Sequence, residues 1–174
     1  MRLTVNLDSE SDEKLKRLET EENISKSQIV REAIDYYEVI CRQWQNVNRE
    51  AFEWYARLLG SKEHRIYDVD HINTLLSQIG SPSEHLLTEW NDIGRKHGVE
   101  WESQFANLEQ KLRVLEYCNW YSITKISDTE YTLTTQSRQE AALVCEFLEG
   151  ECTELGLDAD FRQVDQKIIV KEGV

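Results

Sequence analysis

The four cysteines are the most reactive side chains of the sequence, and their spacing limits their chemistry. No Cys-x-x-Cys pair occurs among Cys41, Cys118, Cys145 and Cys152, which fits reduced thiols better than a disulfide scaffold or a zinc finger. On one helix, Cys145 and Cys152 would lie about 10.5 Å apart along the axis, whereas a disulfide needs Cα atoms within about 7 Å. Cys118 remains as an intrachain partner, and a bridge between chains stays open. Cys118, Cys145 and Cys152 are the candidates for a redox or ligand role, although most buried free cysteines are simply small apolar residues.

Other catalytic patterns are missing from the sequence. The four histidines show no His-x-His or His-x-x-x-His spacing: His64, His71, His85 and His97. We therefore predict no metal site. We find no Gly-rich phosphate loop, no Ser/His/Asp frame and no paired carboxylates, and we expect Glu149, Glu151 and Glu154 to form a solvated helix face. The sequence predicts neither an enzyme nor a cofactor.

Composition restricts the partners of the chain. Its 174 residues include 33 acidic and 20 basic side chains, a net charge of −13. Non-specific affinity for nucleic acid comes mainly from Lys and Arg, so any DNA contact must be confined to a small face. No apolar run is long enough for a membrane span, and the first residues lack the pattern of a secretory signal. We therefore expect a cytoplasmic protein without a membrane partner.

The N-terminal segment predicts a strand and two helices. Residues 2–7 alternate, with Leu3, Val5 and Leu7 apolar and Arg2, Thr4 and Asn6 polar, which is typical of a strand with one buried face. A helix follows to about Glu22, capped by Ser9 or Ser11. Asn23 tolerates the left-handed geometry of a turn, and Ser25 can cap the next helix.

The second helix is predicted to be unusually long. Between Ser25 and Leu59 there is neither Gly nor Pro, and nine apolar residues follow one another at steps of three and four. They are Val30, Ala33, Tyr37, Ile40, Trp44, Val47, Ala51, Trp54 and Leu58. We expect one helix to Leu59, about 50 Å long. A break between Arg42 and Asn48 is the alternative.

The rest of the chain predicts further helices and two hairpins. We expect helices over residues 70–79, 82–97 and 100–117, with Pro82 in a first turn and Gly80 and Gly98 as breaks. Strands are expected over 120–127, 130–135, 158–164 and 167–172, around a helix over 138–155. The fold class is mainly α with a C-terminal α+β domain, ordered strand-strand-helix-strand-strand.

The first 42 residues resemble the ribbon-helix-helix family of the Arc, MetJ and CopG type. The resemblance rests on the strand over 2–7, the helix after it, and Asn23-Ile24-Ser25-Lys26-Ser27 opening a helix that contains Ile29, Val30, Ala33 and Ile34. It implies that two chains pair their strands into an antiparallel ribbon that enters the major groove. A lone strand could not satisfy its backbone. The implied partners are a second copy and double-stranded DNA with a palindromic operator.

The resemblance also implies which residues contact DNA. Arg2, Thr4 and Asn6 would face base edges, with Arg suited to guanine and Asn to adenine. The backbone N–H groups of Ser25, Lys26 and Ser27 would hold a phosphate, helped by the helix dipole and the Lys26 charge. Residues 1–42 contain seven basic and ten acidic side chains, so we expect modest affinity that falls steeply with salt.

Residues 83–172 are similar to the 4-vinyl-reductase-type domain of archaeal and bacterial sensors. The similarity rests on the order of elements and on the segments Cys145-Glu146-Phe147-Leu148-Glu149-Gly150 and Leu155-Gly156-Leu157. It implies a sensor of a small-molecule effector or of redox state that alters DNA binding. A packing or dimerisation domain without a ligand is the alternative.

Together these observations divide the chain into three parts. We expect a DNA-binding domain over 1–42, a helical dimerising extension over 43–60, and a sensor or assembly domain over 61–174. The predicted function is a homodimeric, sequence-specific transcriptional regulator such as a repressor, and assembly into tetramers stays open. The alternative is an antitoxin or scaffold protein that holds a protein partner through its acidic C-terminal region.

Overall fold

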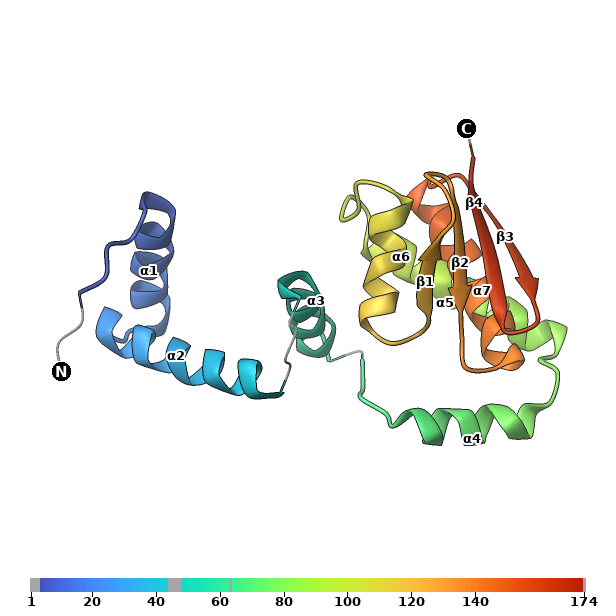
Figure 1. The fold of residues 1–174 in the computed structure, drawn as a ribbon, viewed down its shortest axis with the longest axis horizontal. Helices are drawn as coiled ribbons and strands as arrows, with labels where there is room; N and C mark the ends of the chain where they lie inside the picture. The colour runs from blue at the N-terminus through green and yellow to red at the C-terminus, as the bar shows by residue number, and fades with distance from the viewer. Residues whose placement is uncertain (1–3, 44–47, 63, 174) are drawn as a thin grey trace. The chain divides into compact units, whose positions relative to one another are not determined.

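The computed structural model describes residues 4–43, 48–62 and 64–173 (Figure 1). The chain forms two compact units, Met1–Arg49 and Glu50–Val174. Seven helices and four strands lie in the described residues, and the strands form a ββαββ arrangement with the last helix. This confirms the predicted fold class.

The first unit contains two helices, α1 (Ser9–Glu22) and α2 (Lys26–Gln43). Asp8 caps α1, because its Oδ1 accepts a hydrogen bond from the Ser11 N–H at 2.7 Å. The prediction of Ser9 or Ser11 as the cap is wrong, and a carboxylate at this position also interacts favourably with the helix dipole. Asn23 ends α1 at φ 53°, in the left-handed conformation that the sequence predicts.

The predicted strand over residues 2–7 is not formed in its described part. Residues 4–8 belong to neither a helix nor a strand, and Arg2 and Leu3 lie outside the described residues. A strand exists only when a neighbour pairs with its backbone N–H and C=O groups. The strand therefore remains a prediction for the paired state.

The long helix predicted to reach Leu59 is two helices. α2 ends at Gln43, Asn48 is not helical, and α3 (Arg49–Gly60) follows; residues 44–47 lie outside the described residues. The alternative of a break is therefore correct. Asn favours the position before a helix over its interior. Trp54 and Leu58 of α3 are buried in the second unit, so the periodic apolar residues belong to two separate bodies.

The second unit places helices on one face of an antiparallel sheet. After α3 come α4 (Val69–Ile79), α5 (Glu84–Glu100), α6 (Leu108–Tyr117), β1 (Ser122–Lys125), β2 (Glu130–Thr134), α7 (Arg138–Leu155), β3 (Ala159–Val164) and β4 (Lys167–Glu172). The strand order is β1-β2-β4-β3. α7 packs on the sheet and α5 packs on α7, as Figure 1 shows. Tyr131, Leu133, Phe161, Ile168 and Val170 point from the sheet into the core.

Two predicted helix boundaries are wrong. α5 begins at Glu84 with Ser83 as its cap, so Pro82 precedes the cap instead of lying in the first turn. α5 also runs through Gly98 to Glu100, and α6 begins only at Leu108, after a non-helical connection. Gly98 is a packing residue and not a break, because its surface touches α7.

Three glycines let α5 and α7 approach backbone to backbone. A Cβ atom on Gly94 would lie 2.1 Å from the Phe147 carbonyl oxygen, and one on Gly150 would lie 2.1 Å from the Asn91 carbonyl oxygen. A Cβ on Gly98 would lie 2.8 Å from the Glu151 carbonyl oxygen. None of these carbonyls can move without deforming its helix.

An ion pair lies in the core between α6 and α7. Lys111 Nζ is 2.6 Å from Glu151 Oε2, and neither side chain is exposed to solvent. The Trp101 and Phe105 rings lie 5.4 and 5.7 Å from the Lys111 ammonium. Burial raises the pKa of Glu151, and Lys111 opposes that shift. The prediction that Glu151 lies on a solvated face is therefore wrong.

Gly150→Ala should destabilise the second unit by about 2 kcal/mol or more, because the new methyl group overlaps the backbone of α5. Gly60→Ala is the matched control, since nothing lies within 4 Å of a Cβ at that position. Urea unfolding followed by tryptophan fluorescence measures both. Equal stability of the two variants would show that the helices are not in backbone contact.

Lys111→Met should destabilise the same unit by about 3–5 kcal/mol, because it leaves the Glu151 carboxylate buried without a counter-charge. The double variant Lys111→Met/Glu151→Leu should recover most of this stability. Urea unfolding compares the two variants. A double variant as unstable as the single one would contradict the assignment of a buried ion pair.

Candidate nucleic-acid interface

The N-terminus of α2 presents backbone donors at the surface. Ser25 caps it, with its Oγ accepting from the Gln28 N–H at 3.3 Å, which confirms the predicted cap. The first turn contains no acidic residue. The first N–H groups of a helix have no partner within the helix and carry the positive end of its dipole. The turn formed by Ser25, Lys26 and Ser27 is thus suited to an anion.

Lys26 already has an acidic neighbour. Its Nζ lies 3.6 Å from Asp12 Oδ1 of α1, and about two fifths of each side chain is exposed. Asp12 also pairs with Lys16 on its own helix, and this hydrogen bond is the largest cause that lowers the pKa of Asp12. A phosphate at this turn would therefore compete with an ionised Asp12 for the Lys26 ammonium.

The other predicted contact residues lie on the N-terminal segment. Thr4 and Asn6 are exposed, and Arg2 lies outside the described residues. In the described part of this unit, no hydrogen bond or ion pair joins Thr4 or Asn6 to residues 25–27. The single chain therefore presents the two groups separately.

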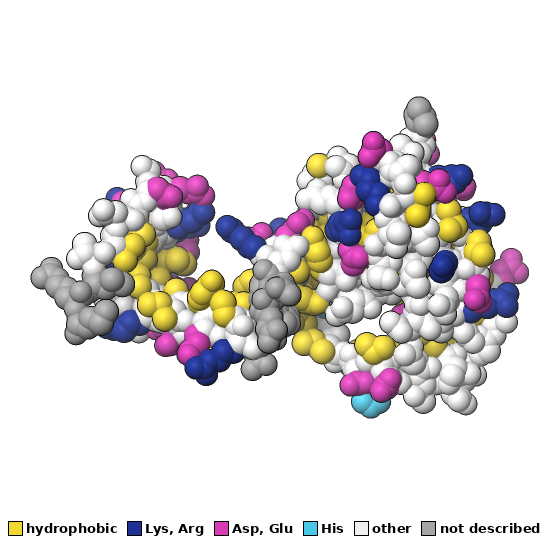
Figure 2. Space-filling view, viewed as in Figure 1, with side chains coloured by type: hydrophobic (Ala, Val, Ile, Leu, Met, Phe, Trp, Pro, Cys, Tyr) yellow, Lys and Arg dark blue, Asp and Glu magenta, His cyan; other side chains and the backbone are white. Residues whose placement is uncertain are grey.

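The described residues of the first unit form no buried core. None of the side chains described in residues 4–42 is buried. Val5 is 61% exposed, Ile34 58% and Tyr37 70%. Leu7, Leu18, Val30, Tyr36 and Val39 are exposed as well. Figure 2 shows these hydrophobic side chains gathered along α2 and α1. Helices of 14 and 18 residues without tertiary packing are marginally stable in water, so this surface needs a cover.

A comparison with known families finds a match for the first unit. Residues 1–39 match the family model described as ribbon-helix-helix protein, copG family. Ribbon-helix-helix domains bind DNA as dimers. The uncovered apolar surface is what such a domain presents before its second copy is added.

The family match covers residues 1–39 and does not extend to the second unit. No curated protein matches the chain. Nothing supports the resemblance of residues 83–172 to the 4-vinyl-reductase-type domain. The ribbon-helix-helix domain is therefore the part of the chain whose family relationship is supported.

The three cysteines of the second unit are free thiols: Cys145 and Cys152 are buried, and Cys118 is partly buried. Burial raises the pKa of Cys118 to about 11 and the pKa of Cys145 and Cys152 to about 12. A thiol with such a pKa is almost fully protonated at neutral pH and is a poor nucleophile. Cys41, in α2, is exposed.

Among the described residues, no group of three His, Cys, Asp or Glu side chains is arranged to hold a metal ion. No helix in that part of the chain combines the length and the hydrophobicity that a membrane span requires.

Sequence reasoning missed a further surface. Glu149 of α7 and Asp160 and Phe161 of β3 line an open cavity in the second unit. The only signal was the acidic run after Cys145, which we interpreted as a solvated helix face.

Ile34→Asp should dissociate the ribbon-helix-helix domain and reduce the helical content of α1 and α2, because it places two charges in the surface that a second copy would cover. The dimer should become less stable by at least about 3 kcal/mol. Sedimentation equilibrium and far-UV circular dichroism report the two effects. Arg31→Ala on the same helix is the control, and equal dissociation constants for both variants would contradict the prediction.

Proposed function

We propose that the chain is a homodimeric, sequence-specific DNA-binding transcriptional regulator. The observation that carries this proposal is the match of residues 1–39 to the copG family, in a unit whose described side chains are all at least partly exposed. A second copy would pair residues 2–7 into a ribbon and cover the apolar side chains of α1 and α2. The same ribbon would enter the major groove.

The alternation of residues 2–7 assigns the two sides of the ribbon. Leu3, Val5 and Leu7 would pack on the helices, and Arg2, Thr4 and Asn6 would face the bases. Arg can bond both acceptors of guanine, and Asn both edge groups of adenine. A twofold dimer reads two equivalent half-sites, so the operator would be palindromic.

The start of α2 would fix the ribbon on the DNA backbone. The N–H groups of Ser25, Lys26 and Ser27 would hold one phosphate per copy, and Lys26 would exchange Asp12 for that phosphate. The net charge of −13 repels DNA elsewhere on the chain. Binding would therefore depend on a few contacts and weaken steeply as salt rises.

The antitoxin or scaffold hypothesis makes a different prediction. In that case the ribbon-helix-helix domain would serve mainly to dimerise the chain, and the acidic second unit would hold a protein partner. DNA binding would then be absent at moderate salt, which the following experiment tests.

Selection from a pool of random duplexes at about 100 mM salt should enrich a palindromic sequence. Arg2→Ala/Asn6→Ala should abolish the enrichment while the dimer stays folded, at about 1–3 kcal/mol for each base-edge interaction that is removed. Arg65→Ala removes an exposed charge from the second unit and should leave the selected sequence unchanged. A folded wild-type dimer that enriches no sequence would overturn the proposal.

Lys26→Ala should weaken binding to all duplexes alike and reduce the slope of log K against log salt by about one for each phosphate that is no longer neutralised. Base preference should stay the same, because an interaction with a phosphate carries no sequence information. Titrations of the selected duplex and of one mismatched duplex over a range of salt concentrations measure this. A changed base preference would assign Lys26 to the bases instead.

A further inference from the structure

The sheet of the second unit has two edge strands, and one of them is closed. On β1, Ile123 directs its N–H away from β2, and Glu116 Oε1 of α6 accepts it at 2.7 Å. Capping an outward backbone donor in this way prevents another chain from pairing there.

The other edge, β3, is open at Ala159 and Phe161, whereas the N–H of Gln163 bonds to Cys145 of α7. The Gly173 N–H donates to the Asp158 carbonyl oxygen at 2.9 Å. In an antiparallel ladder, hydrogen-bonded residue pairs alternate with pairs that are not hydrogen-bonded. Asp160 and Arg162 therefore bond to β4, and the backbone groups of Ala159 and Phe161 point outward. No hydrogen bond to these outward groups is found among the described residues. A free edge of this kind can accept an added strand.

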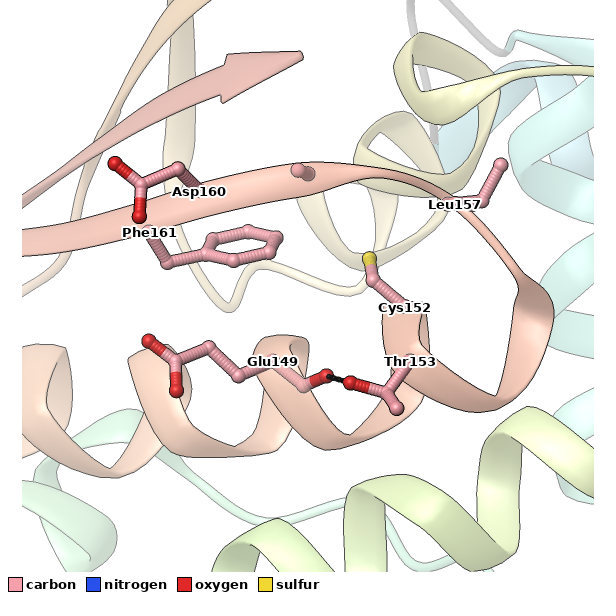
Figure 3. Close-up of a pocket in the computed structure, with 7 residues that line it drawn as sticks. Glu149, Cys152, Thr153, Leu157, Asp160 and Phe161 are labelled. Atoms are coloured by element: carbon pink, nitrogen blue, oxygen red, sulfur yellow. Dashed lines mark hydrogen bonds between the residues drawn. The ribbon is translucent and has the colours of Figure 1, made fainter. Parts of the chain in front are cut away.

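A cavity of about 280 Å³ lies along this edge, and we name it the α7–β3 groove. It is lined by Glu149, Cys152 and Thr153 of α7 and by Ala159, Asp160 and Phe161 of β3. Figure 3 shows the helix and the strand facing each other across it. Thr153 donates its hydroxyl to the Glu149 carbonyl at 2.7 Å, so it is already bonded to its own helix. A groove between an edge strand and a helix suits an extended peptide.

Glu149 is the acidic side chain of the groove that no cation of the described residues neutralises, whereas Asp160 lies opposite Lys171 of β4. Glu149 is half-buried, and its pKa is raised by burial first and then by Glu146 and Asp160. No cation lowers it. Elsewhere in the same unit, Glu154 pairs with Arg95 at 2.7 Å and Glu109 pairs with Lys125 at 2.9 Å. A cation beside Glu149 would therefore supply the counter-charge that the described residues do not.

A second copy of β3 is a poor occupant. Antiparallel pairing centred on Phe161 would set Asp160 opposite Arg162 of the other copy. However, α7 lies on the same face of each sheet, so the twofold axis would also bring Glu146 and Glu149 of the two copies together. Like charges on the two facing helices would oppose association.

We infer that the α7–β3 groove binds an extended basic segment of a partner protein, which adds to β3 as a strand. Its backbone would pair with the outward groups of Ala159 and Phe161. Successive residues of a strand point to opposite faces. One Lys or Arg would therefore lie beside Asp160 on the open face of the sheet, and the next would lie beside Glu149 on the helix side.

A displayed pool of random ten-residue peptides, selected on the full-length chain, tests this inference. Enriched peptides should contain two successive basic residues among β-branched residues. A labelled peptide with the enriched sequence should bind Glu149→Gln/Asp160→Asn at least tenfold more weakly in fluorescence anisotropy. The control variant Glu13→Gln/Asp35→Asn makes the same charge change in the first unit and should bind the peptide as tightly as the wild type does.

N-methylation of the peptide tests the backbone pairing. Affinity should fall at alternate residues only, because only every second peptide N–H faces β3. Peptides without basic enrichment, unchanged affinity for Glu149→Gln/Asp160→Asn, or tolerance of N-methylation at every position would each overturn the inference. A different result would also overturn it. If dimers associate further without peptide, Asp160→Arg breaks this association and Asp160→Arg/Arg162→Asp restores it, the groove binds a second copy of the chain.

Discussion

The uncovered apolar surface of the first unit determines how this chain can fold and what it can bind. Two helices and a six-residue segment cannot bury enough hydrophobic area to offset their conformational entropy. In the proposed dimer, a second copy would solve both problems of this unit at once, because it would cover the exposed side chains of α2 and supply a partner for the N-terminal strand. DNA recognition would then follow from the geometry of the proposed ribbon, since its polar side chains would face away from the helices.

The second unit is stable for different reasons. Gly94, Gly98 and Gly150 bring α5 and α7 into backbone contact, and the Lys111–Glu151 pair lies inside the resulting core. Its sheet is closed on the β1 edge and open on the β3 edge. The chain thus combines a unit whose described side chains are all at least partly exposed with a unit that has its own core and a partly open sheet edge.

Local rules predicted much of this structure. The Arg138–Leu155 helix and the Lys167–Glu172 strand have the predicted bounds, because each is set by clear periodicity between turn residues. The rules failed where tertiary contacts decide: the buried Gly98, and Glu151, which shares a helix face with apolar residues. At the candidate site the Ser25 cap was predictable from residue type, whereas the Asp12 neighbour of Lys26 required the packing of α1 on α2.

Amide hydrogen exchange of residues 4–7 and α2, measured over a range of chain concentrations, decides whether a second copy completes the first unit. If it does, alternate amides of residues 4–7 are protected at high concentration. Dilution removes this protection together with that of α2. Free exchange of residues 4–7 at every concentration, in a chain whose α2 stays protected, would show that the strand does not pair and that the helices are covered in another way.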